Sequence, residues 1–106
     1  MKLMEPIMIH KVLSNETRRD ILEWLKNPEE HFGGLYHAPP NGDRTKGVCV
    51  GDIQAKAGLA QSVISNYLLS MQKAGLLLSE RVGQWTYYRR NEDVIQQFCD
   101  ELKKNL

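Results

Sequence analysis

The sequence predicts a mainly helical α+β domain that carries one β-hairpin towards its C-terminal end. Apolar residues recur at helical spacing along much of the chain, and two runs rich in aliphatic and aromatic residues are separated only by Gly83 and Gln84. A glycine in the first position of a two-residue loop is typical of a tight hairpin turn. With 106 residues the chain has the common size of one domain, so we expect a single domain over residues 1–106.

Two helices are predicted before residue 28. The run from Leu3 to Leu13 is largely apolar and carries Pro6 near its first turn, where proline is tolerated. Ser14 and Asn15 are N-cap candidates for a second helix, which Asn27-Pro28 is expected to end.

Residues 28–47 have the composition of a long connection or insertion. They contain three turn-forming pairs: Gly33-Gly34, Pro39-Pro40 and Asn41-Gly42. A connection of this length is unusual inside a compact domain, so we expect it to be functional or mobile. Three apolar residues could attach part of it to the body of the domain: Phe32, Leu35 and Tyr36.

A short helix and a longer one follow this connection. Asp52 is the expected N-cap of the short helix, which spans residues 53–57 and ends at Gly58. The longer helix spans residues 61–74, and Gly75 ends it. Its core-facing residues recur at i, i+4 and i+7: Ile64, Leu68 and Met71. Two helices joined by a short glycine turn and followed by a hairpin are typical of a winged helix-turn-helix, with the longer helix as recognition helix.

The opposite face of the recognition helix carries side chains suited to DNA. It comprises Gln61 at the N-terminal end, then Ser62, Ser65, Asn66, Leu69 and Lys73. Glutamine and asparagine can pair with adenine, serine hydroxyls can bind bases or phosphates, and lysine favours phosphate. In the wing, Arg81, Gln84 and Arg89 could reach phosphates or an adjacent minor groove.

Positive charge is concentrated in the same part of the chain. The net charge of the whole chain is only +1, but residues 60–90 carry four basic residues and one acidic residue, a net charge of +3. Residues 1–59 carry eight residues of each sign, and residues 91–106 have a net charge of −2. A local basic patch favours nucleic acid more than the total charge indicates.

Three segments resemble the ArsR/SmtB family of bacterial repressors. They are Val48–Leu77 with its two helices, the wing Arg81–Arg89 with its Gly-x-Trp-x-x-Tyr pattern, and Leu13–Leu22. The resemblance covers most of the chain except residues 28–47. It implies a homodimeric winged helix that represses transcription and is released from DNA by metal ions, metalloids or oxidised sulfur species.

The metal-binding motifs of that family are incomplete in this chain. Arsenic-responsive members carry a Cys-x-Cys pair ahead of the short helix, whereas this chain reads Cys49-Val50-Gly51. One thiolate is too few for a soft-metal site, which takes three or four ligands. Zinc-responsive members use Asp, His and Glu ligands along the last helix, and residues 92–106 contain no histidine. We therefore expect neither a metal site nor a cofactor.

Two other effector hypotheses stay open. Cys49 and Cys99 could form a redox-responsive pair, although reduced thiols, with Cys99 on the apolar stripe of the last helix, are the simpler expectation. His31 and His37 could form a metal or small-molecule site with Tyr36, Asp43 and Cys49, although surface histidines explain them more simply.

The two ends of the chain predict a homodimer. The N-terminal run and the amphipathic last helix, residues 92–106, carry more apolar surface than a small winged helix buries by itself. The expected contact residues are Leu3, Ile7, Ile95, Phe98 and Leu102. Pairing across a two-fold axis would place two recognition helices about 34 Å apart, one turn of DNA.

These observations favour a DNA-binding regulator over other classes of protein. No nucleophile–base pairing, phosphate-binding glycine loop or paired-ligand helix is recognisable, so we expect no enzyme. No stretch reaches the ~20 apolar residues of a membrane span, and no signal peptide is recognisable, so a cytoplasmic location is expected. The alternative is a winged helix that binds a protein partner, with Leu69 and Trp85 on exposed surfaces.

Overall fold

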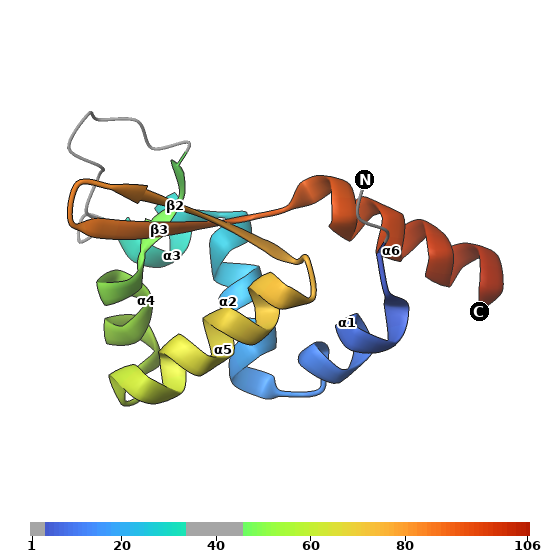
Figure 1. Ribbon diagram of the computed structural model, residues 1–106, viewed down its shortest axis with the longest axis horizontal. Coiled ribbons are helices and arrows are strands. Elements are labelled where there is room, and N and C mark those ends of the chain that lie inside the picture. Colours follow the sequence, from blue (N-terminus) through green and yellow to red (C-terminus); the bar gives the residue numbers. More distant parts are fainter. Residues whose placement is uncertain (1–3, 34–45) are drawn as a thin grey trace.

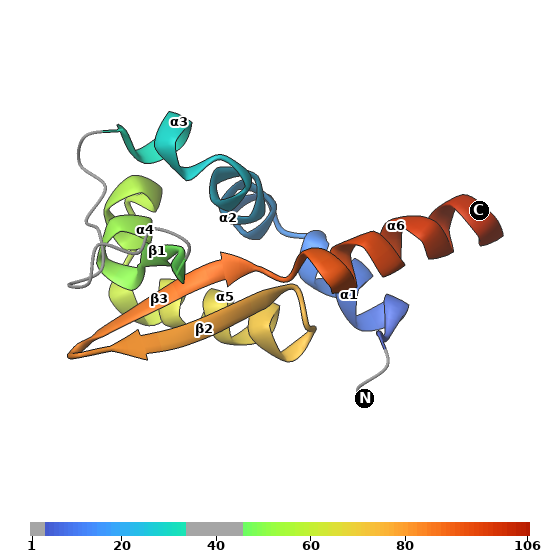
Figure 2. The same cartoon turned by 90° about the horizontal axis from the view of Figure 1, so that it is seen from above.

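The computed structural model describes residues 4–33 and 46–106. Their secondary structure follows the order α1 (Pro6–Leu13), α2 (Glu16–Lys26), α3 (Pro28–Phe32), β1 (Val48–Cys49), α4 (Val50–Ala57), α5 (Gln61–Lys73), β2 (Leu77–Val82), β3 (Trp85–Arg90) and α6 (Glu92–Asn105). Helices α1 and α6 lie at the end of the molecule opposite the tip of the β2–β3 hairpin (Figures 1 and 2). None of the described helices combines the length and the apolar character needed to cross a membrane.

The strands form a small antiparallel sheet in the order β1-β3-β2. The predicted hairpin is confirmed: β2 and β3 pair from Leu77 opposite Arg90 to Val82 opposite Trp85, and Gly83 occupies the turn with a φ of 63°. Strand β1 was not predicted. It comprises only two residues and pairs with β3 through Val48 opposite Tyr88.

Local sequence signals place several helix ends where they were predicted. The Asn15 side chain accepts a 2.9 Å hydrogen bond from the Arg18 N–H and caps α2. Gly75 follows α5 with a φ of 86°, a left-handed conformation that favours glycine. Its N–H donates to the Gln72 carbonyl and the next N–H donates to the Met71 carbonyl, which is the Schellman arrangement that ends a helix.

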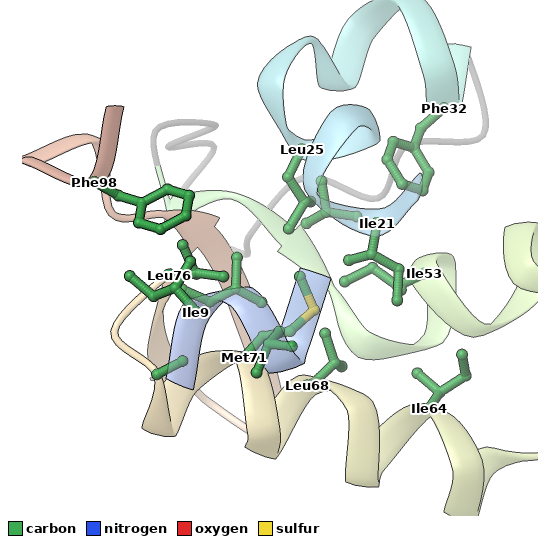
Figure 3. Close-up of a cluster of buried hydrophobic side chains, with 14 residues drawn as sticks. Ile9, Ile21, Leu25, Phe32, Ile53, Ile64, Leu68, Met71, Leu76 and Phe98 are labelled. Carbon is green, nitrogen blue, oxygen red and sulfur yellow. The ribbon is translucent and has the colours of Figure 1, made fainter. Parts of the chain in front are cut away.

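A continuous hydrophobic core joins helices α1 to α6 to the sheet (Figure 3). The predicted inner face of α5 is confirmed, because Ile64, Leu68 and Met71 are fully buried. They pack in one cluster with residues of α1, α2 and α4, among them Ile9, Ile21 and Ile53, which are also fully buried. Burying a side chain of this size stabilises the fold by about 1.5–3 kcal/mol, so this cluster holds α5 against the rest of the domain.

Two local predictions about the connection and the short helix were wrong. Residues 28–32 form helix α3 rather than loop, because Pro28 is as well suited to the first turn of a new helix as to ending the previous one. Helix α4 begins at Val50 with Cys49 in the N-cap position, so Asp52 lies inside its first turn instead of capping it. Phe32 is buried and packs edge-to-face on Trp24, as expected of an attachment point; Leu35 and Tyr36 lie outside the described residues.

Candidate nucleic-acid interface

The outer face of α5 presents the polar surface that the sequence predicted. Gln61, Ser62, Ser65, Asn66, Leu69 and Lys73 are all exposed, on the side of the helix opposite its fully buried residues. Two amides and two hydroxyls therefore face solvent within the first two turns, where base edges could be reached in a major groove.

The N-terminal end of α5 is electrostatically suited to a phosphate. Its first turn contains no acidic residue, and Ala60 in the N-cap position makes no side-chain cap. A helix N-terminus carries a partial positive charge and directs N–H groups outward, which favours an anion.

The turn between α4 and α5 is fixed by backbone and side-chain hydrogen bonds. The Gly58 N–H donates to the Gln54 carbonyl at 2.9 Å, and the Gln54 side-chain amide donates to the Leu59 carbonyl at 3.4 Å. Because Gln54 is in α4, its amide links the short helix to the segment that enters the recognition helix. Helix α4 is thereby tied to the start of α5.

The wing carries its basic side chains in a small network. Arg81 is exposed, and its Nε donates to the Gly83 carbonyl across the hairpin turn at 3.2 Å. Arg89 lies 3.9 Å from the Glu80 carboxylate, which also pairs with Lys46 at 2.8 Å. The carboxylate therefore compensates part of the wing's positive charge. The sequence did not predict this pairing, because Lys46 and Glu80 are far apart in the chain and no local pattern connects them.

The predicted DNA-binding residues belong to two elements, α5 and the β2–β3 hairpin. Figure 2 shows α5 and the β2–β3 hairpin on the same side, with α2 and α3 on the other. Gln84 and Trp85 are exposed at the tip of the wing, and Trp85 is 45% exposed. Leu69, which is 49% exposed, adds an apolar group to the polar face of α5.

The residues predicted to contact a second chain differ in how much of their surface is exposed in the single chain. In α1, Ile7 is 66% exposed. In α6, Ile95 and Leu102 are partly buried against the core. Phe98 is only 6% exposed in the single chain and packs edge-to-face on His10, so it offers less surface to a partner than Ile7 does. Leu3 lies outside the described residues.

The two cysteines lie in different surroundings and far apart in the fold. Cys49 is buried at the end of β1, and burial raises the pKa of its thiol, with a further contribution from the charge of Asp52. Cys99 is exposed on α6, so the expectation of a core thiol was wrong. Strand β1 and α6 lie towards opposite ends of the molecule (Figure 2), which disfavours a bond between the two thiols within one chain.

Of the residues in the histidine hypothesis, the structure describes His31 and Cys49. His31 lines a cavity of about 220 Å³ between α3 and α4, together with Phe32, Asp52 and Lys56. Within residues 4–33 and 46–106, no group of three or more His, Cys, Asp or Glu side chains is arranged to hold a metal ion. His37, Tyr36 and Asp43 lie outside the described residues.

Comparison with known proteins gives the family. No protein-family model matches the chain. The chain is 46% identical over 105 residues to the HTH-type transcriptional regulator YbzH of Bacillus subtilis, covering 97% of this chain and 100% of that protein. It is 36% identical to the arsenic resistance transcriptional regulator ArsR1 of Pseudomonas putida, covering 99% of this chain and 68% of that protein.

The fold of the chain is similar to that of a solved structure. The ArsR-like transcriptional regulator from Rhodococcus sp. RHA1 superposes with a TM-score of 0.65 at 20% identity, covering 93% of this chain and 76% of that chain. The chain belongs to the ArsR family of DNA-binding helix-turn-helix transcriptional regulators.

Proposed function

We propose that the chain is a cytoplasmic transcriptional repressor that binds an imperfectly palindromic operator in double-stranded DNA as a homodimer. The observation that carries this proposal is the division of α5 into two faces. Ile64, Leu68 and Met71 are fully buried, while the opposite side exposes a continuous row of amide and hydroxyl side chains. A helix held this firmly can present its outer face to a groove without losing its orientation.

The residues have different roles in this proposal. Gln61 and Asn66 read adenine edges, and Ser62 and Ser65 bind bases or phosphates. The remaining residues position the protein on the DNA backbone: Lys73, Arg81, Gln84 and Arg89. The chain has no catalytic role in this account.

The homodimer is proposed from the surface of α1 and α6. Ile7 is 66% exposed and Met8 is 37% exposed on α1, beside α6 (Figure 1). Covering this surface with the same surface of a second chain would remove apolar area from water. Each Å² removed would stabilise the dimer by roughly 25 cal/mol. Two recognition helices would then face successive major grooves on one side of the DNA.

Selection from random duplex DNA tests the proposal. The purified full chain is incubated with the duplex pool at near-physiological salt, and bound fragments are amplified over several rounds. We expect an inverted repeat whose half-site centres lie about one helical turn apart. The selection is repeated with metal ions and with oxidants, because loss of enrichment identifies the class of effector. Failure to enrich any sequence would overturn the proposal.

A second candidate function rests on the exposed apolar residues. Leu69 and Trp85, 49% and 45% exposed, could contact a protein partner instead of DNA. Pull-down with nuclease-treated extract separates the two functions. A partner that is retained by the wild-type chain and lost with Trp85→Ala, combined with no enrichment of DNA, would favour this function.

A further inference from the structure

Arg18 lies between helix α1 and the recognition helix α5. It belongs to the first turns of α2, and its Nε donates to the Val12 carbonyl at 2.8 Å. Its Nη2 donates to the Lys11 carbonyl at 3.4 Å. Both acceptors are in the last turn of α1, where carbonyl groups lack partners within the helix and a cation is favourable. The guanidinium therefore binds the C-terminal end of α1, where the Ser14 N–H and hydroxyl also donate to the Lys11 carbonyl.

The same guanidinium contacts α5. Its central carbon lies 5.1 Å from the centre of the Tyr67 ring, within the range of a cation–π interaction. The Tyr67 hydroxyl also accepts a 3.4 Å hydrogen bond from the side-chain amide of Asn15, the residue that caps α2. Tyr67 is thus held on its face and at its hydroxyl by residues at the corner between α1 and α2.

Tyr67 occupies a sensitive position in α5. It directly follows Asn66, which is exposed on the proposed DNA-binding face, and directly precedes Leu68, which is fully buried. The residue of α5 that Arg18 contacts therefore lies between the exposed and the buried face of this helix.

We propose that Arg18 is a positioning residue that sets the orientation of α5 relative to α1 and thereby the spacing of operator half-sites that the dimer accepts. The inference rests on the proposed function, because half-site spacing has meaning only for a dimer on DNA. Helix α1 belongs to the proposed dimer surface, so a rigid link from α1 to α5 fixes the distance between two recognition helices. One extra base pair moves a half-site by about 3.4 Å and rotates it by roughly 35°, which a rigid link does not tolerate.

The test uses the operator selected with the wild-type chain and derivatives whose spacer is one or two base pairs longer or shorter. Fluorescence anisotropy gives the dissociation constant for each duplex and for a single half-site. The measured quantity is the ratio of the dissociation constant for an altered spacer to that for the native spacer. A loss of folded protein lowers binding to every duplex equally and leaves this ratio unchanged.

Four variants separate the roles of the contacts. Arg18→Met removes the charge and the planar group while it keeps the stem, and we expect the ratio to fall about two- to thirtyfold. Arg18→Lys keeps the charge and should restore part of the discrimination. Tyr67→Phe keeps the ring and should stay within about twofold of wild type. Arg19→Met, at the exposed neighbouring arginine, is the matched control and should behave as wild type.

The outcomes are distinguishable. A lower ratio with Arg18→Met, at an unchanged affinity for the half-site, supports the positioning role. An unchanged ratio overturns it, as does a uniform loss of affinity for all duplexes, since that would indicate a phosphate contact or a general folding role. If Arg18→Met does not fold, the same ratio of dissociation constants is compared between Arg18→Lys and the control Arg19→Met, and that comparison decides the question. If the wild-type chain binds no duplex at all, the proposed function fails and this inference fails with it.

Discussion

Gly47 lies directly against the main-chain carbonyl of Tyr88, just before β1 pairs with β3. Its φ of 104° is in the region that L side chains rarely adopt, and a Cβ at this position would overlap the Tyr88 carbonyl oxygen. The ion pair between Lys46 and Glu80 fixes the preceding residue to the wing. The segment that enters β1 is therefore tied to the hairpin by backbone geometry and by charge.

Gly47→Ala should destabilise the fold strongly. We expect the free energy of unfolding to fall by at least about 2 kcal/mol, because backbone strain adds to a steric overlap with main-chain atoms. Urea unfolding at fixed protein concentration measures the change. Gly51→Ala is the control: Gly51 is exposed in α4 with open space around its Cα, and alanine there should be neutral or stabilising by up to about 1 kcal/mol. An equal loss of unfolding free energy in Gly47→Ala and Gly51→Ala would contradict this account of Gly47.

Leu68→Ala and Leu69→Ala should differ sharply although the residues are neighbours. Leu68 is fully buried, so its truncation leaves a cavity and should cost about 2–5 kcal/mol of unfolding free energy. Leu69 is 49% exposed, and its truncation should change stability by less than about 0.5 kcal/mol. The same urea experiment compares the two variants. A large loss of unfolding free energy with Leu69→Ala would show that the two faces of α5 are assigned wrongly.

Glu92 should stabilise the fold only while it is ionised. The side-chain hydrogen bonds from Arg90 hold the pKa of this carboxyl below its ordinary value. A depressed folded-state pKa adds stability above the pKa of the unfolded chain, so the contribution is present above about pH 5 and is lost as the pH falls below about 4. Because the Glu92 side chain is 67% exposed, solvent screening limits the contribution to about 1 kcal/mol or less.

Unfolding of Glu92→Gln at several pH values checks this expectation. The difference from wild type should be constant near neutrality and should vanish in acid. Asp93→Asn, which removes a neighbouring acidic residue from the first turn of α6, is the control for net charge and helix dipole. If both variants lose the same stability with the same pH dependence, the contact with Arg90 is not the cause.

Cys49 should react slowly with alkylating agents in the folded protein. It is 4% exposed, and burial raises the pKa of its thiol, so little of the reactive thiolate is present at neutral pH. The Cys99→Ser chain, which keeps only Cys49, should be labelled fully only after denaturation. The Cys49→Ser chain, which keeps the exposed Cys99, should be labelled faster. Rapid labelling of Cys49 in the folded state would reopen the redox hypothesis.

The parts of the fold that depend on local patterns could be predicted from the sequence. The inner face of α5 follows from apolar spacing, its end follows from Gly75, and the hairpin follows from the Gly83-Gln84 turn between two β-prone runs. The outer face of α5 is the complement of its inner face, so the exposure of Ser65 and Asn66 could also be predicted.

Features that depend on distant parts of the chain could not be predicted in this way. Strand β1 exists because Val48 pairs with Tyr88, and two residues carry no periodicity of their own. Cys99 follows the buried Phe98 by one position, about 100° around the helix, which is enough to turn it from the core to solvent. The contact of Arg18 with Tyr67 joins residues of two helices, and only the packing of these helices brings them together.

The most direct test of the account is the affinity of the full wild-type chain for its selected operator, compared with a scrambled duplex of the same length and composition. Fluorescence anisotropy at physiological salt gives both dissociation constants. The account predicts that the operator binds at least about 10³-fold more tightly and takes up two chains per duplex. Equal affinities for the two duplexes, or no binding to either, would contradict it.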